Sequence, residues 1–261
     1  MSKQSIREAF EGGALVPYLV AGDPTPEDTA EYAQALVNGG ADVLELGLPF
    51  SEPVADGPTI QAGIRRALDA GMTPDRYLDL IDRLDLGVPL VAMTYYNMLF
   101  RYGDGDITEF VSEAAAVGLS GLIVPDLPVE ESGALLEACA AQNIATVFIV
   151  APTTTGDRLD RIVDRASGFL YVQARLGTTG ARSDVSAHTG RSLDRLPETK
   201  TPTAVGFGVS TAEQAEQIVD AGADGVVAGS VFVDIIASGE TVSNRLENKA
   251  AELAAGVRAG R

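Results

Sequence analysis

The stretch Gly39-Gly-Ala-Asp-Val-Leu-Glu45 joins the end of a helical pattern to a short apolar run. A glycine directly after a helical pattern suits a helix C-cap, and the apolar residues that follow are typical of a buried strand. The same plan recurs at Gly118-Leu-Ser-Gly-Leu-Ile-Val124 and at Gly222-Ala-Asp-Gly-Val-Val-Ala228. Because the join is repeated at distant places, it indicates a chain built from successive helix–strand units.

Short apolar runs of this kind occur eight times along the chain. We predict strands at residues 14–20, 43–46, 90–95, 121–124, 145–150, 169–172, 203–207 and 226–228. Amphipathic stretches preceded by capping residues lie between them, as at 26–37, 130–141 and 212–221. Near-continuous apolar strands are typical of a parallel sheet covered by helices. An open doubly wound sheet is the competing fold, but eight regular units favour a closed (β/α)8 barrel.

The length of 261 residues is compatible with one such barrel, since single (β/α)8 barrels commonly have about 250 residues. No linker-like or low-complexity segment divides the chain. We therefore expect one α/β domain over residues 1–261, a TIM barrel with additional terminal helices. The Ala- and Glu-rich tail, residues 241–261, is predicted to be a helix that packs outside the barrel.

The charge of the chain excludes several classes of partner. Nineteen basic and 37 acidic residues give a net charge of −18. Nucleic acids and anionic membranes are polyanions, so neither is an expected partner. Lysine occurs only at positions 3, 200 and 249. An acidic surface almost without lysine favours a protein that works in concentrated salt, where screening weakens self-repulsion; an ordinary acidic bacterial protein is the alternative.

Other features argue against membrane and metal roles. No apolar run approaches the roughly 18 to 20 residues that cross a bilayer. The first residues are polar and do not form a signal peptide. A single cysteine, Cys139, and a single histidine, His188, do not supply a cysteine- or histidine-rich metal site. We expect a cytoplasmic protein, with His188 on the surface and Cys139 in the core.

Carboxylates at the ends of the predicted strands are candidates for catalysis, because a TIM barrel carries its chemistry on the loops that follow its strands. Glu45 lies within the apolar run Val43-Leu-Glu-Leu46. Burial raises the pKa of a carboxyl towards the range for proton transfer, which favours a catalytic role over a polar barrel layer. Asp56 follows in a stiff loop rich in proline and glycine that suits an active site, although Asp-Gly-Pro is also ordinary turn chemistry. Asp23 is expected to be a turn or helix-cap residue, and Asp126 fits a structural or a functional role equally.

Glycines cluster after the last three predicted strands. They occur in Leu176-Gly-Thr-Thr-Gly180, in Gly206-Phe-Gly208 and in Ala228-Gly-Ser230. Glycines after strands 7 and 8 that lead to a helix N-terminus are the usual phosphate site of a barrel. Gly206 and Gly208 lack the third glycine of a dinucleotide fingerprint. The pattern therefore predicts a phosphorylated substrate.

The residue types that are absent from the predicted strand ends exclude further kinds of catalysis. Lys3 and Lys249 lie near the termini and Lys200 precedes strand 7, so no lysine is placed for a Schiff base. What remains is carboxylate acid–base chemistry on a phosphorylated substrate. Two carboxylates break a carbon–carbon bond only if the substrate supplies its own electron sink.

Several segments resemble the tryptophan synthase alpha chain family over essentially the whole length. They are Val16-Pro-Tyr-Leu-Val-Ala-Gly-Asp-Pro24, Leu44-Glu-Leu-Gly-Leu-Pro-Phe-Ser-Glu-Pro-Val-Ala-Asp-Gly-Pro-Thr-Ile-Gln61, Met93-Thr-Tyr-Tyr-Asn97 and Gly206-Phe-Gly-Val-Ser210. The resemblance implies a lyase that reversibly cleaves indole-3-glycerol phosphate to indole and glyceraldehyde 3-phosphate. It also implies no cofactor in this chain and a separate beta chain that carries pyridoxal phosphate, in an alpha2beta2 assembly.

The resemblance also implies roles for individual residues. Glu45 matches the general acid–base, and Asp56 matches the residue that holds the indole N–H and stabilises the cationic ring. The motifs further match substrate-binding positions at Tyr18, Tyr95, Tyr171, Thr179 and Phe207, and phosphate-binding positions at Gly180, Gly208, Gly229 and Ser230. The chain departs from the family at Glu52, where the family usually has aspartate.

Three other functions are compatible with the sequence. One is another phosphate-binding barrel enzyme, such as an isomerase of the same pathway. A second is a free-standing lyase that releases indole without a beta chain. The third is a barrel kept only as an activator of the beta chain, against which the presence of both Glu45 and Asp56 argues.

Overall fold

The strands of the protein form a closed parallel barrel. A computed structural model describes residues 3–102, 105–173, 189–206 and 208–261. The strands are β1 (Ala14–Val20), β2 (Leu44–Gly47), β3 (Leu90–Met93), β4 (Gly121–Ile123), β5 (Ala145–Val150), β6 (Leu170–Gln173), β7 (Thr203–Gly206) and β8 (Gly225–Ala228). Each strand pairs in parallel with the next, and β8 pairs with β1. The predicted (β/α)8 barrel is confirmed.

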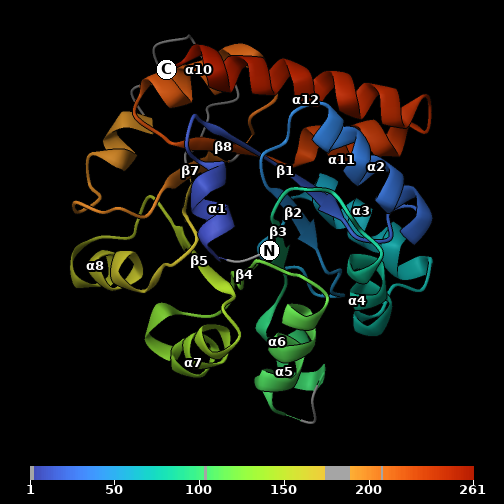
Figure 1. Ribbon diagram of the computed structural model, residues 1–261, viewed down its shortest axis with the longest axis horizontal. Helices are drawn as coiled ribbons and strands as arrows, with labels where there is room; N and C mark the ends of the chain where they lie inside the picture. The colour runs from blue at the N-terminus through green and yellow to red at the C-terminus, as the bar shows by residue number, and fades with distance from the viewer. Residues whose placement is uncertain (1–2, 103–104, 174–188, 207) are drawn as a thin grey trace.

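Helices surround this barrel (Figure 1). They include α1 (Lys3–Ala9), α2 (Pro26–Asn38), α3 (Pro58–Asp69), α4 (Pro74–Asp82), α5 (Tyr96–Tyr102), α6 (Ile107–Ala116), α7 (Gly133–Ala141), α8 (Gly156–Arg165), α10 (Ala212–Asp220), α11 (Ser230–Ser238) and α12 (Val242–Ala259), with a short 3-10 helix η1 (Val129–Glu131). In the part of the chain that the structure describes, no helix is both long and apolar enough to span a membrane.

Two predicted boundaries were wrong in an informative way. The strand predicted at 90–95 ends at Met93, because α5 begins at Tyr96 and its first N–H bonds to Asp126. The helix predicted at 130–141 is divided into η1 and α7. Ser132 lies at the division and its hydroxyl donates to the carbonyl of Val129. The other strands agree with prediction to within a residue or so.

The helix α1 closes the amino-terminal mouth of the barrel. Ile6 and Phe10 are buried in the interior cluster, together with inward-facing residues such as Val16, Val91 and Phe169. The rings of Phe10 and Phe169 lie 5.3 Å apart. Apolar side chains of the described residues fill this end, which leaves the carboxyl-terminal mouth for a ligand.

The tail forms α12, which packs outside the barrel as predicted. It contacts α10, α2 and α11 and lies across one side of the molecule (Figure 1). Gly256 lies so close to the carbonyl of Ala212 that a side chain at this position would overlap the backbone. The close approach explains why α12 carries a glycine in its last turns. Cys139 on α7 is buried, as expected.

Candidate active site

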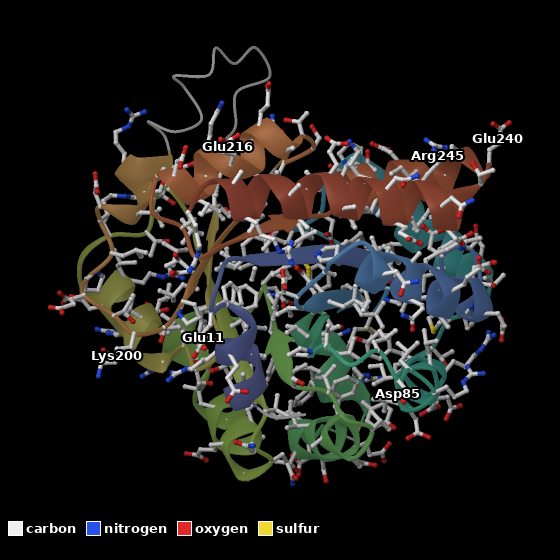
Figure 2. All side chains as sticks on the ribbon, turned by 45° about the horizontal axis from the view of Figure 1, so that its top comes forward. Glu11, Asp85, Lys200, Glu216, Glu240 and Arg245 are labelled. Carbon is white, nitrogen blue, oxygen red and sulfur yellow. The ribbon has the colours of Figure 1, made fainter. Side chains whose placement is uncertain are left out.

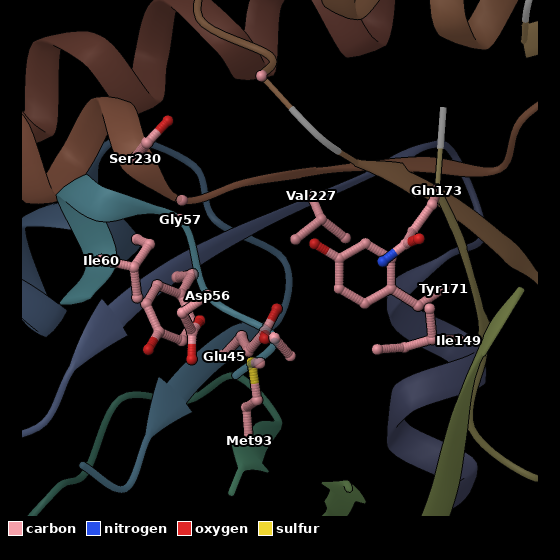
Figure 3. A pocket seen from close by; sticks show the side chains of 14 residues that line it. Glu45, Asp56, Gly57, Ile60, Met93, Ile149, Tyr171, Gln173, Val227 and Ser230 are labelled. Atoms are coloured by element: carbon pink, nitrogen blue, oxygen red, sulfur yellow. The ribbon is translucent and has the colours of Figure 1, made fainter. Parts of the chain in front are cut away.

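A cavity of about 190 Å³ opens at the carboxyl-terminal mouth (Figure 3). Its described lining comes from six strands and from the segments after β2, β7 and β8. The residues are Tyr18, Glu45, Ala55, Asp56, Gly57, Ile60, Met93, Ile149, Tyr171, Gln173, Gly208, Val227, Gly229 and Ser230. The barrel therefore brings both predicted catalytic carboxylates into one cavity.

Glu45 reaches the cavity because β2 alternates between two faces. Val43, two residues before it, belongs to the cluster inside the barrel, whereas Leu44 and Leu46 pack against the helices outside. Glu45 therefore points inward, beside Tyr18 on β1. On the outer side, the hydroxyl of the buried Tyr77 donates to the carbonyl of Leu46 at 2.8 Å, which holds this strand in place.

The carboxyl of Glu45 is buried, and one of its two oxygens lacks a hydrogen-bond partner. The residue is 1% exposed, and its Oε2 makes no hydrogen bond. Burial, with a smaller contribution from the nearby Asp56, raises the pKa of Glu45 to about 8. The group is therefore mostly protonated at neutral pH and can donate a proton.

Asp56 has a different environment in the loop between β2 and α3. The hydroxyl of Tyr95 donates to Asp56 Oδ2 at 2.6 Å and accepts the N–H of Ala55 at 3.0 Å. Burial raises the pKa of Asp56, while the hydrogen bond from Tyr95 opposes the shift by stabilising the ionised carboxylate. Tyr95 thus fastens the loop and favours an anionic Asp56.

The position of Tyr95 differs from that expected for a substrate-binding residue. Its ring packs against Phe50, with 5.2 Å between the ring centroids, and it is not among the described residues that line the cavity. The side chain lies behind Asp56 because its hydroxyl is bonded to the loop.

Tyr18 and Tyr171 face the cavity, as expected for substrate-binding residues. Burial, together with the carboxylates of Glu45 and Asp56, raises the pKa of both phenols well above the usual value. Both therefore stay neutral. Small neighbours leave room for the rings, since a side chain at Gly47 would overlap Tyr18 and one at Gly206 would overlap Tyr171.

The end of the cavity that is formed by the segments after β7 and β8 has the features of a phosphate site. Gly229 precedes α11, and Ser230 is the first residue of that helix. Gly208 adopts φ +85°, a conformation that glycine accommodates without strain. The described lining contains no lysine or arginine, so backbone N–H groups and the Ser230 hydroxyl are the donors that it offers. Four residues with predicted roles lie outside the described part of the chain. They are Thr179, Gly180 and Phe207 at the site, and His188, which is expected on the surface.

Two other carboxylates at this mouth have structural partners. Asp23 is buried and accepts two hydrogen bonds of 2.7 Å from the guanidinium of Arg66 on α3. The cap of α2 is Thr25, not Asp23. Asp126 accepts the N–H of Tyr96 at 2.9 Å at the start of α5. Neither carboxylate lines the cavity.

Sequence reasoning missed part of the lining. Gln173 lies two residues after Tyr171 and so faces the same side of β6, a signal that period-2 alternation provides. The other missed residues are Ala55 and Gly57 in the loop after β2, and Ile60, Met93, Ile149 and Val227, whose side chains make the walls apolar. No group of three or more histidine, cysteine, aspartate or glutamate side chains within the described ranges is placed to hold a metal ion.

The chain resembles known proteins over nearly its whole length. The family model described as tryptophan synthase alpha chain matches residues 5–259. The tryptophan synthase alpha chain of Halobacterium salinarum is 58% identical, covering 100% of this chain and 98% of that protein. The alpha chain of Haloferax volcanii is 56% identical, covering 98% and 96%.

Solved structures agree with these relatives. A chain of tryptophan synthase from M. tuberculosis, in an aminoacrylate-bound form, superposes with a TM-score of 0.85 at 33% identity, covering 97% of this chain and 99% of that chain. A chain of the tryptophan synthase a2b2 complex from Pyrococcus furiosus has a TM-score of 0.83 at 38% identity, covering 93% and 98%. Because the family model matches nearly the whole chain and relatives are more than 50% identical to it, this barrel lyase belongs to the tryptophan synthase alpha chain family.

Proposed function

We propose that the cavity catalyses the reversible cleavage of indole-3-glycerol phosphate to indole and glyceraldehyde 3-phosphate. The observation that carries this proposal is the environment of Glu45, a buried carboxyl whose free Oε2 and pKa of about 8 suit proton transfer. The cavity around it has apolar walls for an aromatic ring and a glycine-rich end for a phosphate.

In the proposed reaction, Glu45 first donates its proton to C3 of the indole ring. The ring becomes an indoleninium cation, which is the electron sink. The Glu45 carboxylate then accepts the proton of the hydroxyl on the carbon bonded to C3. The electron pair of that O–H bond forms the aldehyde, the carbon–carbon bond breaks, and its electrons return to the ring. Neutral indole and glyceraldehyde 3-phosphate result, and Glu45 regains its proton.

Asp56 stabilises the intermediate in this scheme. Its carboxylate accepts the indole N–H and stabilises the positive charge that develops on the ring. The Tyr95 hydroxyl, 2.6 Å from Asp56 Oδ2, orients the carboxylate. Tyr18 and Tyr171 pack against the ring, and Gly208, Gly229 and Ser230 hold the phosphate, to which Gly180 contributes.

A beta chain is the partner that we propose for this protein. The relative from Pyrococcus furiosus belongs to an a2b2 complex. The loop that carries Asp56 also exposes Val54, a large apolar side chain that is 82% exposed. Docking of a beta chain on this loop would order Asp56 and pass indole to the pyridoxal phosphate of the partner. We place the assembly in the cytoplasm and treat residues 1–261 as one domain.

Indole release tests the proposal. The purified chain is incubated with indole-3-glycerol phosphate, with and without a beta chain, and indole is measured. We expect slow release alone and faster release with the partner. Conversion of phosphoribosyl anthranilate instead of indole-3-glycerol phosphate would establish the isomerase alternative. Acceleration of the beta chain without any indole release would establish the activator.

A further inference from the structure

Gln173 is a polar residue of the cavity to which the proposed reaction assigns no role. It is the last residue of β6, and its amide points into the cavity beside Tyr171 (Figure 3). The amide makes no hydrogen bond with another described side chain, in contrast to Asp56, which is bonded to Tyr95. Among the described residues, this amide at the cavity wall is therefore available to a ligand.

The position of Gln173 lies between the two ends of the cavity. Tyr171 and Gln173 face the same side of β6, and about 6–7 Å of strand separates them. Gln173 is therefore closer to the mouth than Tyr171 is. It pairs with Gly206 of β7, two residues before Gly208. The amide thus lies between the level of the ring-binding residues and the phosphate end.

The chemistry of the lining makes the amide distinctive. Ile60, Met93, Ile149 and Val227 are apolar. The other polar side chains of the lining already have roles in the proposed reaction: Glu45 and Asp56 in the chemistry, Tyr18 and Tyr171 against the ring, and Ser230 at the phosphate. The proposed substrate carries two hydroxyls between its ring and its phosphate. One loses its proton to Glu45, and the other, on the middle carbon, needs a partner. A neutral amide both donates and accepts, so it bonds a hydroxyl without adding charge near the phosphate.

We infer that Gln173 is a specificity-determining residue whose side-chain amide hydrogen-bonds the middle-carbon hydroxyl of the substrate. The inference rests on the proposed function, because it uses the three-carbon chain of indole-3-glycerol phosphate. It predicts that the site distinguishes a hydroxylated chain from a deoxygenated chain at this position.

The test compares two ligands in one assay on the full-length protein. The first is indole-3-glycerol phosphate as substrate. The second is 3-(indol-3-yl)propyl phosphate, which has the same ring and phosphate but neither hydroxyl and is tested as a competitor of the substrate. The variant is Gln173→Leu, with Gln173→Met as a second variant of closer shape. The matched control is Gln142→Leu, an exposed glutamine that follows α7 at the opposite mouth of the barrel.

We expect Gln173→Leu and Gln173→Met to lower kcat/KM about tenfold, the size of one lost neutral hydrogen bond. The inhibition constant of the deoxygenated ligand should change less than about twofold, because that ligand has no hydroxyl to lose. Gln142→Leu should match the wild type with both ligands.

Two results would overturn the inference. Equal weakening of both ligands would mean that Gln173 contacts the ring or the phosphate, or only supports the fold. Unchanged kcat/KM in both variants would remove the residue from recognition. Failure of the proposed function is a separate result, since the wild-type protein would then release no indole.

Discussion

At the scale of single residues, the site consists of two carboxylates that share a cavity but not an environment. Glu45 is buried with a free Oε2, whereas Asp56 accepts a hydrogen bond of 2.6 Å from Tyr95. Burial without a partner on Oε2 favours the protonated form of Glu45, whereas the hydrogen bond from Tyr95 stabilises the ionised form of Asp56. This difference supports the proposal that Glu45 transfers the proton and that Asp56 stabilises the cationic ring.

Replacing either carboxylate should stop the reaction without unfolding the protein. Glu45→Gln removes the titrating group, and general acid–base catalysis contributes about 10²–10⁴-fold. Asp56→Asn removes charge stabilisation of roughly 3–4 kcal/mol. We therefore expect indole release to fall at least about 100-fold in each variant.

The controls for this prediction are a third variant and a second ligand. Asp126→Asn should keep its activity, because the amide oxygen can still accept the Tyr96 N–H. Both catalytic variants should still bind glycerol phosphate. Near-normal turnover of Glu45→Gln would remove Glu45 from the mechanism.

The pH dependence of catalysis should reflect both carboxylates. Glu45 must be protonated to donate, so kcat/KM should fall as the pH rises through about 8. Asp56 must be ionised, so activity should also fall at acidic pH. Rates measured from pH 5 to 10 should give a bell-shaped profile; a constant rate through pH 8–10 would contradict the assignment of Glu45.

The free energy of unfolding should also depend on the protonation of Glu45. Its pKa is about 8 in the folded protein against an ordinary 4.5, so the folded state holds the proton more tightly. The resulting stabilisation is complete below pH 4.5 and is lost between 4.5 and 8. Denaturant unfolding of the wild type and of Glu45→Gln should diverge over this interval in favour of the variant, with a slope of up to about 1.4 kcal/mol per pH unit.

At the scale of elements, the loop between β2 and α3 connects the reaction to the surface. Tyr95, which follows β3, fastens it through Asp56 and the N–H of Ala55. Gln61 on α3 adds a hydrogen bond of 2.8 Å to the carbonyl of Asp56. The exposed Val54 lies two residues before Asp56.

Removing the Tyr95 hydroxyl should loosen this loop and change the titration of Asp56. The hydrogen bond lowers the pKa of Asp56, so Tyr95→Phe should move the acidic limb of the pH–rate profile to higher pH. Loss of the hydrogen bond from the neutral Tyr95 hydroxyl to the charged Asp56 carboxylate should lower kcat about tenfold. Tyr96→Phe, next in sequence but without a hydrogen bond to the loop, is the matched control. An acidic limb that stays in place would mean that Tyr95 does not tune Asp56.

The outer face of the loop should determine activation by a beta chain. Val54→Asp places a charge where an apolar contact is expected, but its 82% exposure means that the isolated chain should keep its stability and basal rate. Acceleration by the beta chain should fall at least about tenfold, the effect of losing a contact of more than 1 kcal/mol. Ala70→Asp, which adds the same charge after the far end of α3, should not reduce it. Full acceleration of Val54→Asp would place the partner elsewhere.

At the scale of the whole molecule, charge is the dominant property. Acidic side chains such as Glu11, Asp85, Glu216 and Glu240 lie on the exterior (Figure 2). With a net charge of −18, repulsion among them opposes the compact state. Similar relatives come from the halophiles Halobacterium salinarum and Haloferax volcanii. We propose that this protein is adapted to concentrated salt.

Salt should therefore stabilise the fold. Screening shortens the range of repulsion from about 30 Å at 0.01 M to about 3 Å at 1 M salt. The melting temperature should rise substantially between dilute buffer and molar KCl. Sucrose is the control, because it favours burial without screening charge. A flat or falling melting temperature in KCl would contradict adaptation to salt.

Local patterns in the sequence were sufficient to predict much of the fold of this protein. Strand and helix periodicity depend on neighbouring residues, so the eight strands, the barrel and the tail helix could be predicted. Glu45 could be predicted to lie at the site because a carboxylate interrupts an apolar strand, and Gly208 and Gly229 because they follow strands in order; all three line the cavity. The family resemblance supplied the role that we propose for Asp56.

Only the tertiary structure decided which distant residues meet. Tyr95 bonds Asp56 from 39 positions away, and Arg66 bonds Asp23 across 43. Nothing near Glu45 in the sequence shows that its Oε2 lacks a partner. Gln173 lies beside Gly206 because of the register of β6 against β7. Barrel closure sets these distances, whereas local periodicity determines only the face of each element on which a residue lies.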